Sequence, residues 1–183
     1  DFFLVLEQAE STEPLRANTV MDNFRYLPQK PTFFNPDGLA VGFVKESYQG
    51  KDYVGYTCAA CHTGQVNYKG QALRIDGGPA MADMVGFLTA LEKAMKATQA
   101  DTQKRDRFVQ AVLARDNSYS SADDVNKDLD KWTNTIILYN TVNHSHLDYG
   151  YARLDAFGRI YNRVLQHVIN KEQLKLALLS VAN

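Results

Sequence analysis

Apolar residues recur at steps of three and four through five segments after residue 78, and this spacing predicts amphipathic helices. The first helix is expected to begin at Pro79, whose fixed φ suits a first helical turn, and to end near Ala97. The other segments are residues 102–115, 121–139, 151–169 and 173–181. The residues expected to face a core are Met81, Met84, Leu88, Leu91, Met95, Phe108, Val109, Val112, Val125, Leu129, Trp132, Ile136, Tyr139, Leu154, Phe157, Tyr161, Val164 and Val168.

The first half of the chain has weaker periodicity. Residues 1–27 have helix-like spacing at the start and a second short helical pattern over 18–24. Three prolines and Gly38 then predict a loop. Alternating residues on either side of Lys69-Gly70 predict a hairpin with strands near 65–68 and 71–75.

The strongest chemical signal is the pentapeptide Cys58-Ala-Ala-Cys61-His62, which holds both cysteines of the chain. A dithiol redox pair uses Cys-x-x-Cys, but it is expected in a βαβ unit, and no such pattern is visible. A structural zinc site needs four ligands, for which His144 and His146 would have to complete the set. The third interpretation, which the spacing favours, is covalent attachment of haem.

Haem attachment explains why all three groups are so close together. Two thiols add across the porphyrin vinyl groups, and the adjacent imidazole reaches the iron from the same face. The sequence therefore predicts one haem c bound through Cys58 and Cys61, with His62 as the proximal iron ligand. Because such attachment normally takes place outside the cytoplasmic membrane, we expect a bacterial periplasmic or secreted protein whose signal peptide is absent from this chain.

These elements together predict a mainly α fold, namely a cytochrome-c-like helical domain built around a covalent haem, with one small β-hairpin. Residues 1–183 are expected to form a single haem domain. Within it we expect an N-terminal extension (residues 1–50), a haem-attachment core (51–100) and a helical remainder (101–183).

The ligand on the distal face of the iron decides between electron transfer and reaction with oxygen or peroxide. Methionine candidates are Met81 and Met84, although both fit the apolar stripe of the predicted helix and methionine commonly fills cores. Histidine candidates are His144, His146 and His167. An open position stays a third alternative.

Two further side chains suit a haem pocket. Arg74 is a candidate to pair with a propionate, since guanidinium binds carboxylates in bidentate fashion. Trp132, the only tryptophan, is a candidate to lie beside the porphyrin, with ordinary core packing as the alternative. Asp155 and Arg159, one turn apart, predict a helix ion pair.

Composition narrows the class of partner. Lysine and arginine number 20 against 21 acidic residues, so the net charge of −1 indicates no nucleic-acid interface. No apolar run reaches the roughly 20 residues that span a bilayer.

Several stretches together resemble the first haem domain of di-haem cytochromes, a group that includes the bacterial rubber oxygenases and, more distantly, the di-haem cytochrome c peroxidases. The matching stretches are DFFLVLEQAES, RYLPQ, NPDGLAVGFVK, YVGYTCAACHTGQVNYKGQALRIDGGPAMADM and YGYARLDAFGRIYNRV. The resemblance implies two covalent haems, of which the first meets oxygen or peroxide and the second serves as electron partner.

The chain departs from that pattern because a second Cys-x-x-Cys-His is absent. Its apolar end favours a fragment of a longer di-haem protein, with a natural single-haem relative as the alternative. Two functions follow as expectations. One is part of a haem peroxidase or oxygenase, acting on peroxide, O₂ or an organic substrate with electrons from a second haem domain or a partner cytochrome. The other is a single-haem electron carrier without catalytic activity. A structural metal-binding module is a third possibility.

Overall fold

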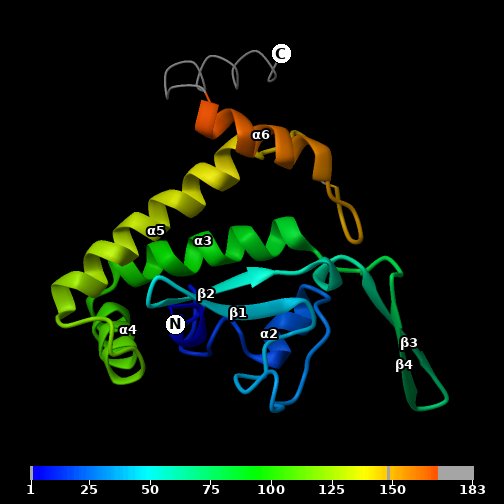
Figure 1. The fold of residues 1–183 in the computed structure, drawn as a ribbon, viewed down its shortest axis with the longest axis horizontal. Coiled ribbons are helices and arrows are strands. Elements are labelled where there is room, and N and C mark those ends of the chain that lie inside the picture. The colour runs from blue at the N-terminus through cyan, green and yellow to red at the C-terminus, as the bar shows by residue number, and fades with distance from the viewer. Residues whose placement is uncertain (1, 148, 169–183) are drawn as a thin grey trace.

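A computed structural model describes residues 2–147 and 149–168. It contains about 47% helix and 17% strand, with two separate antiparallel hairpins. The predicted mainly α, cytochrome-c-like class is therefore wrong, and the fold is mixed α and β (Figure 1). The error arose because one of the two hairpins lies in residues 43–56, to which the sequence analysis assigned no helix or strand.

The three longest helices pack on one another and follow the predicted periodicity. They are α3 (Met84–Ala100), α4 (Thr102–Arg115) and α5 (Ala122–Val142). Each begins at a side chain that accepts hydrogen bonds from free N–H groups of the first turn. The capping residues are Asp83, Asp101 and Ser121. As predicted, Phe108, Val109 and Val112 of α4 are buried.

Two predicted helix starts are wrong. Helix α3 begins at Met84 and not at Pro79, because the Asp83 carboxylate accepts a hydrogen bond from Gly86 N at 2.8 Å and so fixes the N-cap. Helix α6 (Ala156–Val168) begins five residues after the predicted Tyr151. The cause is the positive φ of Gly150 and Ala152, a conformation that helices exclude.

The predicted hairpin is confirmed as β3 (Thr63–Tyr68) and β4 (Gln71–Asp76), joined at Lys69-Gly70. The unpredicted hairpin consists of β1 (Phe43–Tyr48) and β2 (Lys51–Tyr56). Its turn residues, Gln49 and Gly50, both have positive φ, which is the signature of a two-residue type I′ hairpin turn. This hairpin lies against the helices, as Figure 1 shows, and its second strand leads directly into the cysteine motif.

The N-terminal region forms part of the core. It contributes the short helices α1 (Phe2–Val5) and α2 (Asn18–Asn23) and several fully buried side chains, which include Leu4, Leu6, Leu15 and Met21. Glu7 holds this region to α4 through two hydrogen bonds of 2.7 Å from Arg107. These bonds, with a further one from Lys104, keep the pKa of Glu7 below its ordinary value.

Helix α6 has its apolar residues exposed, contrary to expectation. The exposed residues are Phe157, Ile160, Tyr161, Val164 and Val168. The helix predicted over 173–181 lies outside the described residues. Among those that the structure describes, no helix is both long and apolar enough to cross a membrane.

Candidate haem-attachment site

The cysteine motif forms a single tight turn. Residues Cys58–Ala60 are a 3₁₀ helix (η1), and the carbonyl of Cys58 accepts hydrogen bonds from Cys61 N at 3.1 Å and His62 N at 2.9 Å. Both thiols are exposed and unpaired, and His62 is exposed next to them. Two free thiols and an imidazole are therefore held close together by one short turn.

Neighbouring segments hold this turn by their backbones. Gly77 N donates to the His62 carbonyl at 2.8 Å, and Ala80 N donates to the Cys61 carbonyl at 2.9 Å. The β3–β4 hairpin therefore begins at the motif, and the residues that follow β4 form hydrogen bonds back to it. On the other side, Thr57 N donates to the Gly42 carbonyl at 2.8 Å, which joins the motif to the start of β1.

Gly42 is a residue of the site that the sequence analysis missed. It has a φ of +84°, and a Cβ placed on it would lie 2.0 Å from Ala60 N. No side chain fits at that distance, so only glycine allows the backbone before β1 to approach the motif turn. The signal available in the sequence was the Val-Gly-Phe step just before an alternating strand pattern.

Substitution of Gly42 by alanine is expected to destabilise the protein by about 3 kcal/mol or more, because backbone strain and overpacking against Ala60 add together. The matched control is Gly50→Ala. Gly50 also has positive φ, at +76°, but a Cβ there meets nothing within 4 Å. The control should therefore show only the cost of the left-handed backbone, about 1–2 kcal/mol. Urea denaturation of both variants measures the difference, and equal losses would contradict this account.

The local fold argues against a dithiol redox pair. The motif follows an antiparallel hairpin and begins with a three-residue 3₁₀ turn, whereas a βαβ unit would have a long helix at this place. Burial raises the pKa of the Cys61 thiol, and the neighbouring Cys58 raises it further.

Two tyrosines lie behind the motif. Tyr26 is 2% exposed, and its hydroxyl has no hydrogen-bond partner among the described residues. Its ring stacks on Tyr56 with centroids 6.2 Å apart. Burial raises the pKa of Tyr26, and the nearby charges of Cys61 and Asp83 raise it further. A buried, unpartnered donor beside the motif fits a site that receives a polar group from a bound molecule.

The three histidines predicted as distal ligands differ in their surroundings. A cleft of about 500 Å³ lies between α3, the end of α5 and the segment that follows it, and His144 lines this cleft. His146 is exposed, with its ring centroid 5.7 Å from that of His144. His167 belongs to α6, but its side chain lies outside the described residues. Val85, which follows the segment between the motif and α3, lines the cleft. The carbonyl of Ala82 in that segment accepts a hydrogen bond from Ala152 N at 3.2 Å, which joins it to the residues before α6.

Arg159 lines the same cleft and was not predicted there. The expected ion pair between Asp155 and Arg159 is wrong. Asp155 instead accepts a hydrogen bond from Gly158 N at 2.8 Å, while Arg159 donates to the hydroxyl of Tyr139 at 3.2 Å. Capping of α6 by Asp155 therefore leaves the guanidinium free to face the cleft.

The methionines also differ from expectation. Met81 is 60% exposed in the segment before α3, so its predicted place in the core is wrong. It directly follows Ala80, whose N–H binds the motif. Met84 is partly buried against the core, and Met21 and Met95 are buried in it. Met81 is thus the methionine whose thioether is accessible near the motif.

Arg74 and Trp132 are not brought to the motif. Arg74 stays on the β3–β4 hairpin and donates to the Pro28 carbonyl at 2.7 Å and to Gln65 at 3.1 Å. Trp132 packs edge-on against Tyr53, with centroids 5.9 Å apart. Since Tyr53 precedes Tyr56 by three strand residues, Trp132 lies about 10 Å along β2 from the end that adjoins the motif.

A zinc site gains no support from the geometry. Within residues 2–147 and 149–168, no three histidine, cysteine or acidic side chains gather in an arrangement that would hold a metal ion. The donor set of the motif suits haem attachment better, because that chemistry needs only two sulfurs and one imidazole.

Comparison with known proteins adds one relative. The chain is 39% identical over 115 residues to the "Uncharacterized protein y4iJ" of Sinorhizobium fredii (strain NBRC 101917 / NGR234). The match covers 61% of this chain and 19% of that protein, so the chain spans about a fifth of the length of its relative. No family model matches the chain, and no solved structure matches it. The similarity to di-haem cytochromes therefore stays a prediction.

Proposed function

We propose that the chain is a c-type haem domain that takes part in redox chemistry. One haem is attached through Cys58 and Cys61, and His62 binds its iron. The observation that carries this proposal is the motif turn itself, where two exposed, unpaired thiols and an exposed imidazole share one hydrogen-bonded turn. Such attachment favours the periplasm or the exterior of a bacterium.

The chain's own groups account for attachment without an oxidant. Cys58 and Cys61 would hold the haem, since each would add its S–H across one vinyl group, with sulfur bonding to one carbon and hydrogen to the other. The unpaired state of both thiols supports this step, since a disulfide would block it.

When bound, haem supplies an iron centre that exchanges one electron. His62 would hold the iron, and the Tyr26 hydroxyl would donate a hydrogen bond to a polar group at the site. Arg159, which lines the cleft, is a better candidate than Arg74 to pair with a haem propionate, because Arg74 is already bound to the Pro28 carbonyl. Met81 and His144 are the exposed candidates for the distal position, with His146, His167 and an open position as the alternatives.

In the intact protein we propose that this haem exchanges electrons with a second haem domain or a partner cytochrome. We also propose that O₂ or peroxide reacts at this haem, and that an organic substrate can take part in the reaction. The alternative is a single-haem carrier in which both axial positions are filled. The di-haem resemblance favours the first function.

Optical spectra of protein matured in a haem-attaching host test the proposal. We expect haem bands that stay with the polypeptide in acidified acetone, because thioether bonds survive this extraction. A spectral shift on adding carbon monoxide or cyanide would support reaction at an open position. Low-spin bands that neither ligand changes would support the carrier, and the variants H144A, H146A, H167A and M81A would then identify the distal ligand. A colourless preparation would contradict the proposal and favour a metal-binding module.

A further inference from the structure

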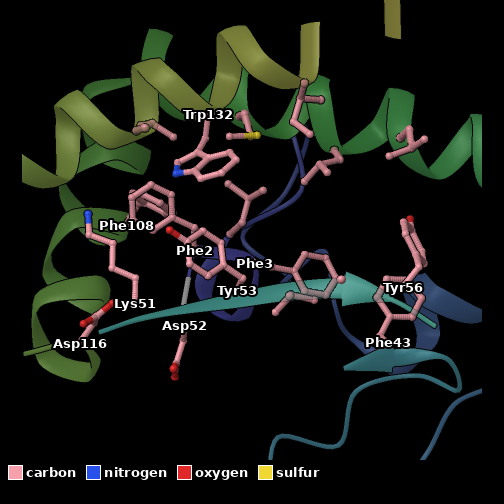
Figure 2. Close-up of a pocket in the computed structure, with 18 of the residues that line it drawn as sticks. Phe2, Phe3, Phe43, Lys51, Asp52, Tyr53, Tyr56, Phe108, Asp116 and Trp132 are labelled. Atoms are coloured by element: carbon pink, nitrogen blue, oxygen red, sulfur yellow. The ribbon is translucent and has the colours of Figure 1, made fainter. Parts of the chain in front are cut away.

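A second site lies between the β1–β2 hairpin and the helices, and the motif side chains are not part of it. It is a cavity of about 260 Å³ between β2, the N-terminal residues, and helices α3, α4 and α5 (Figure 2). Its walls are aromatic and aliphatic side chains, among them Phe2, Phe87, Leu91, Trp132 and Ile136. None of Cys58, Cys61 and His62 lines it. We propose that this cavity binds a small, uncharged, apolar organic molecule of about ten non-hydrogen atoms.

The size of the cavity supports a ligand of this class. Protein interiors are close-packed, and voids larger than a water molecule are few. An apolar cavity of about 150 Å³ is large enough to stay dry and bind benzene. A volume of 260 Å³ therefore accommodates a larger molecule, such as a bicyclic aromatic compound.

The charged residues at one end of the cavity limit the charge that a ligand can carry. Lys51 and Asp116 lie at the end of the cavity remote from Phe43 and Tyr56, and Asp52 extends from β2 on the side away from the helices, as Figure 2 shows. Lys51 and Asp52 are each paired with a group of opposite charge, whereas Asp116 only accepts a backbone hydrogen bond. Lys51 Nζ donates to Asp128 at 2.7 Å, Asp52 binds Ser47 and lies 3.4 Å from Lys45, and Asp116 accepts from Ser118 N at 2.9 Å.

Because Lys51 is already paired with Asp128, an anionic ligand would lose its hydration without gaining a free counter-charge, which is strongly unfavourable in an apolar site. A neutral molecule has no such cost. The cavity also extends along β2 to Tyr56, two residues before the motif, so its occupant would lie next to the haem site. Binding itself does not depend on haem.

Calorimetry with indole and naphthalene tests the proposal on the haem-loaded protein. Both compounds are expected to bind in a saturable manner, whereas benzoate, the charged control, is expected not to bind. Ile136→Phe places a phenyl ring in the cavity and should weaken binding by at least about tenfold. The matched control is Ile137→Phe, because Ile137 is the next residue of α5 and does not line the cavity.

Three results would overturn the proposal. One is no binding of either neutral compound to the haem-loaded protein. The second is equal affinity in the Ile136→Phe and Ile137→Phe variants. The third is binding by the haem-free variant C58S/C61S that disappears when haem is attached, since the cavity would then belong to the porphyrin. If the haem-loaded protein binds neither compound, the cavity proposal fails and the proposed haem function stands. If a colourless protein binds both compounds, the haem function fails and the cavity proposal stands.

Discussion

Replacement of both Cys58 and Cys61 by serine is expected to abolish covalent attachment of haem. Serine has nearly the same shape, and both positions are exposed, so the fold should change in stability by no more than about 0.5 kcal/mol. The hydroxyl of serine does not add to a vinyl group under the conditions in which a thiol does. Intact-mass spectrometry should show the polypeptide plus one haem for the natural chain and the polypeptide alone for the double variant.

The single variants C58S and C61S provide the graded control. Each keeps one thiol, so one thioether can form, and the haem should stay attached at lower yield. The variant H62A, in contrast, keeps both thiols and should alter the spectrum rather than the mass. Haem that remains covalently bound in the double variant, or a natural chain whose mass never includes haem, would contradict the attachment site.

Phe87→Ala is expected to cause a large loss of stability. Phe87 is 2% exposed and lies at the centre of an aromatic cluster. Its ring contacts those of Phe3, Phe24, Tyr26, Phe43 and Tyr56 at centroid distances of 5.5 to 6.4 Å. Truncation removes these contacts and leaves a cavity, so we expect a cost of about 4 kcal/mol.

That cost is a large part of the roughly 5–15 kcal/mol that stabilises a typical domain. Urea denaturation followed by far-ultraviolet circular dichroism measures it. The matched control is Phe33→Ala, because Phe33 is 90% exposed and its loss should change the free energy of unfolding by less than about 0.5 kcal/mol. Similar midpoints for the two variants would show that the cluster around Phe87 does not hold the core together.

The cluster also links the fold to the site. Tyr26 and Tyr56 contact Phe87 on one side and lie beside the motif on the other. Loss of Phe87 should therefore lower the yield of attached haem even under conditions in which the variant stays folded. The N-terminal segment, which the sequence analysis treated as an extension, contributes Phe3, Phe24 and Tyr26 to this arrangement.

Local patterns predicted well those elements whose cause is local. The three long helices follow from apolar spacing, and β3–β4 follows from alternation around Lys69-Gly70. The β1–β2 hairpin was missed although its turn, Gln49-Gly50, has the same pair of positive φ values as Lys69-Gly70. The sequence analysis did not read the residues on either side of Gln49-Gly50 as paired strands. The start of α3 was misplaced because Pro79 is a permissible first residue, whereas the cap at Asp83 is decided by a specific hydrogen bond.

For the candidate site, the sequence by itself determined the two sulfurs and the imidazole of Cys58, Cys61 and His62, because five consecutive residues fix their spacing in any fold. Only the tertiary structure decided what surrounds them. It placed Gly42 against Ala60, Tyr26 behind the motif, Arg159 in the cleft and Trp132 in a separate apolar cavity. These contacts join residues far apart in the chain, and their energies depend on packing and exclusion of water, which local spacing does not determine.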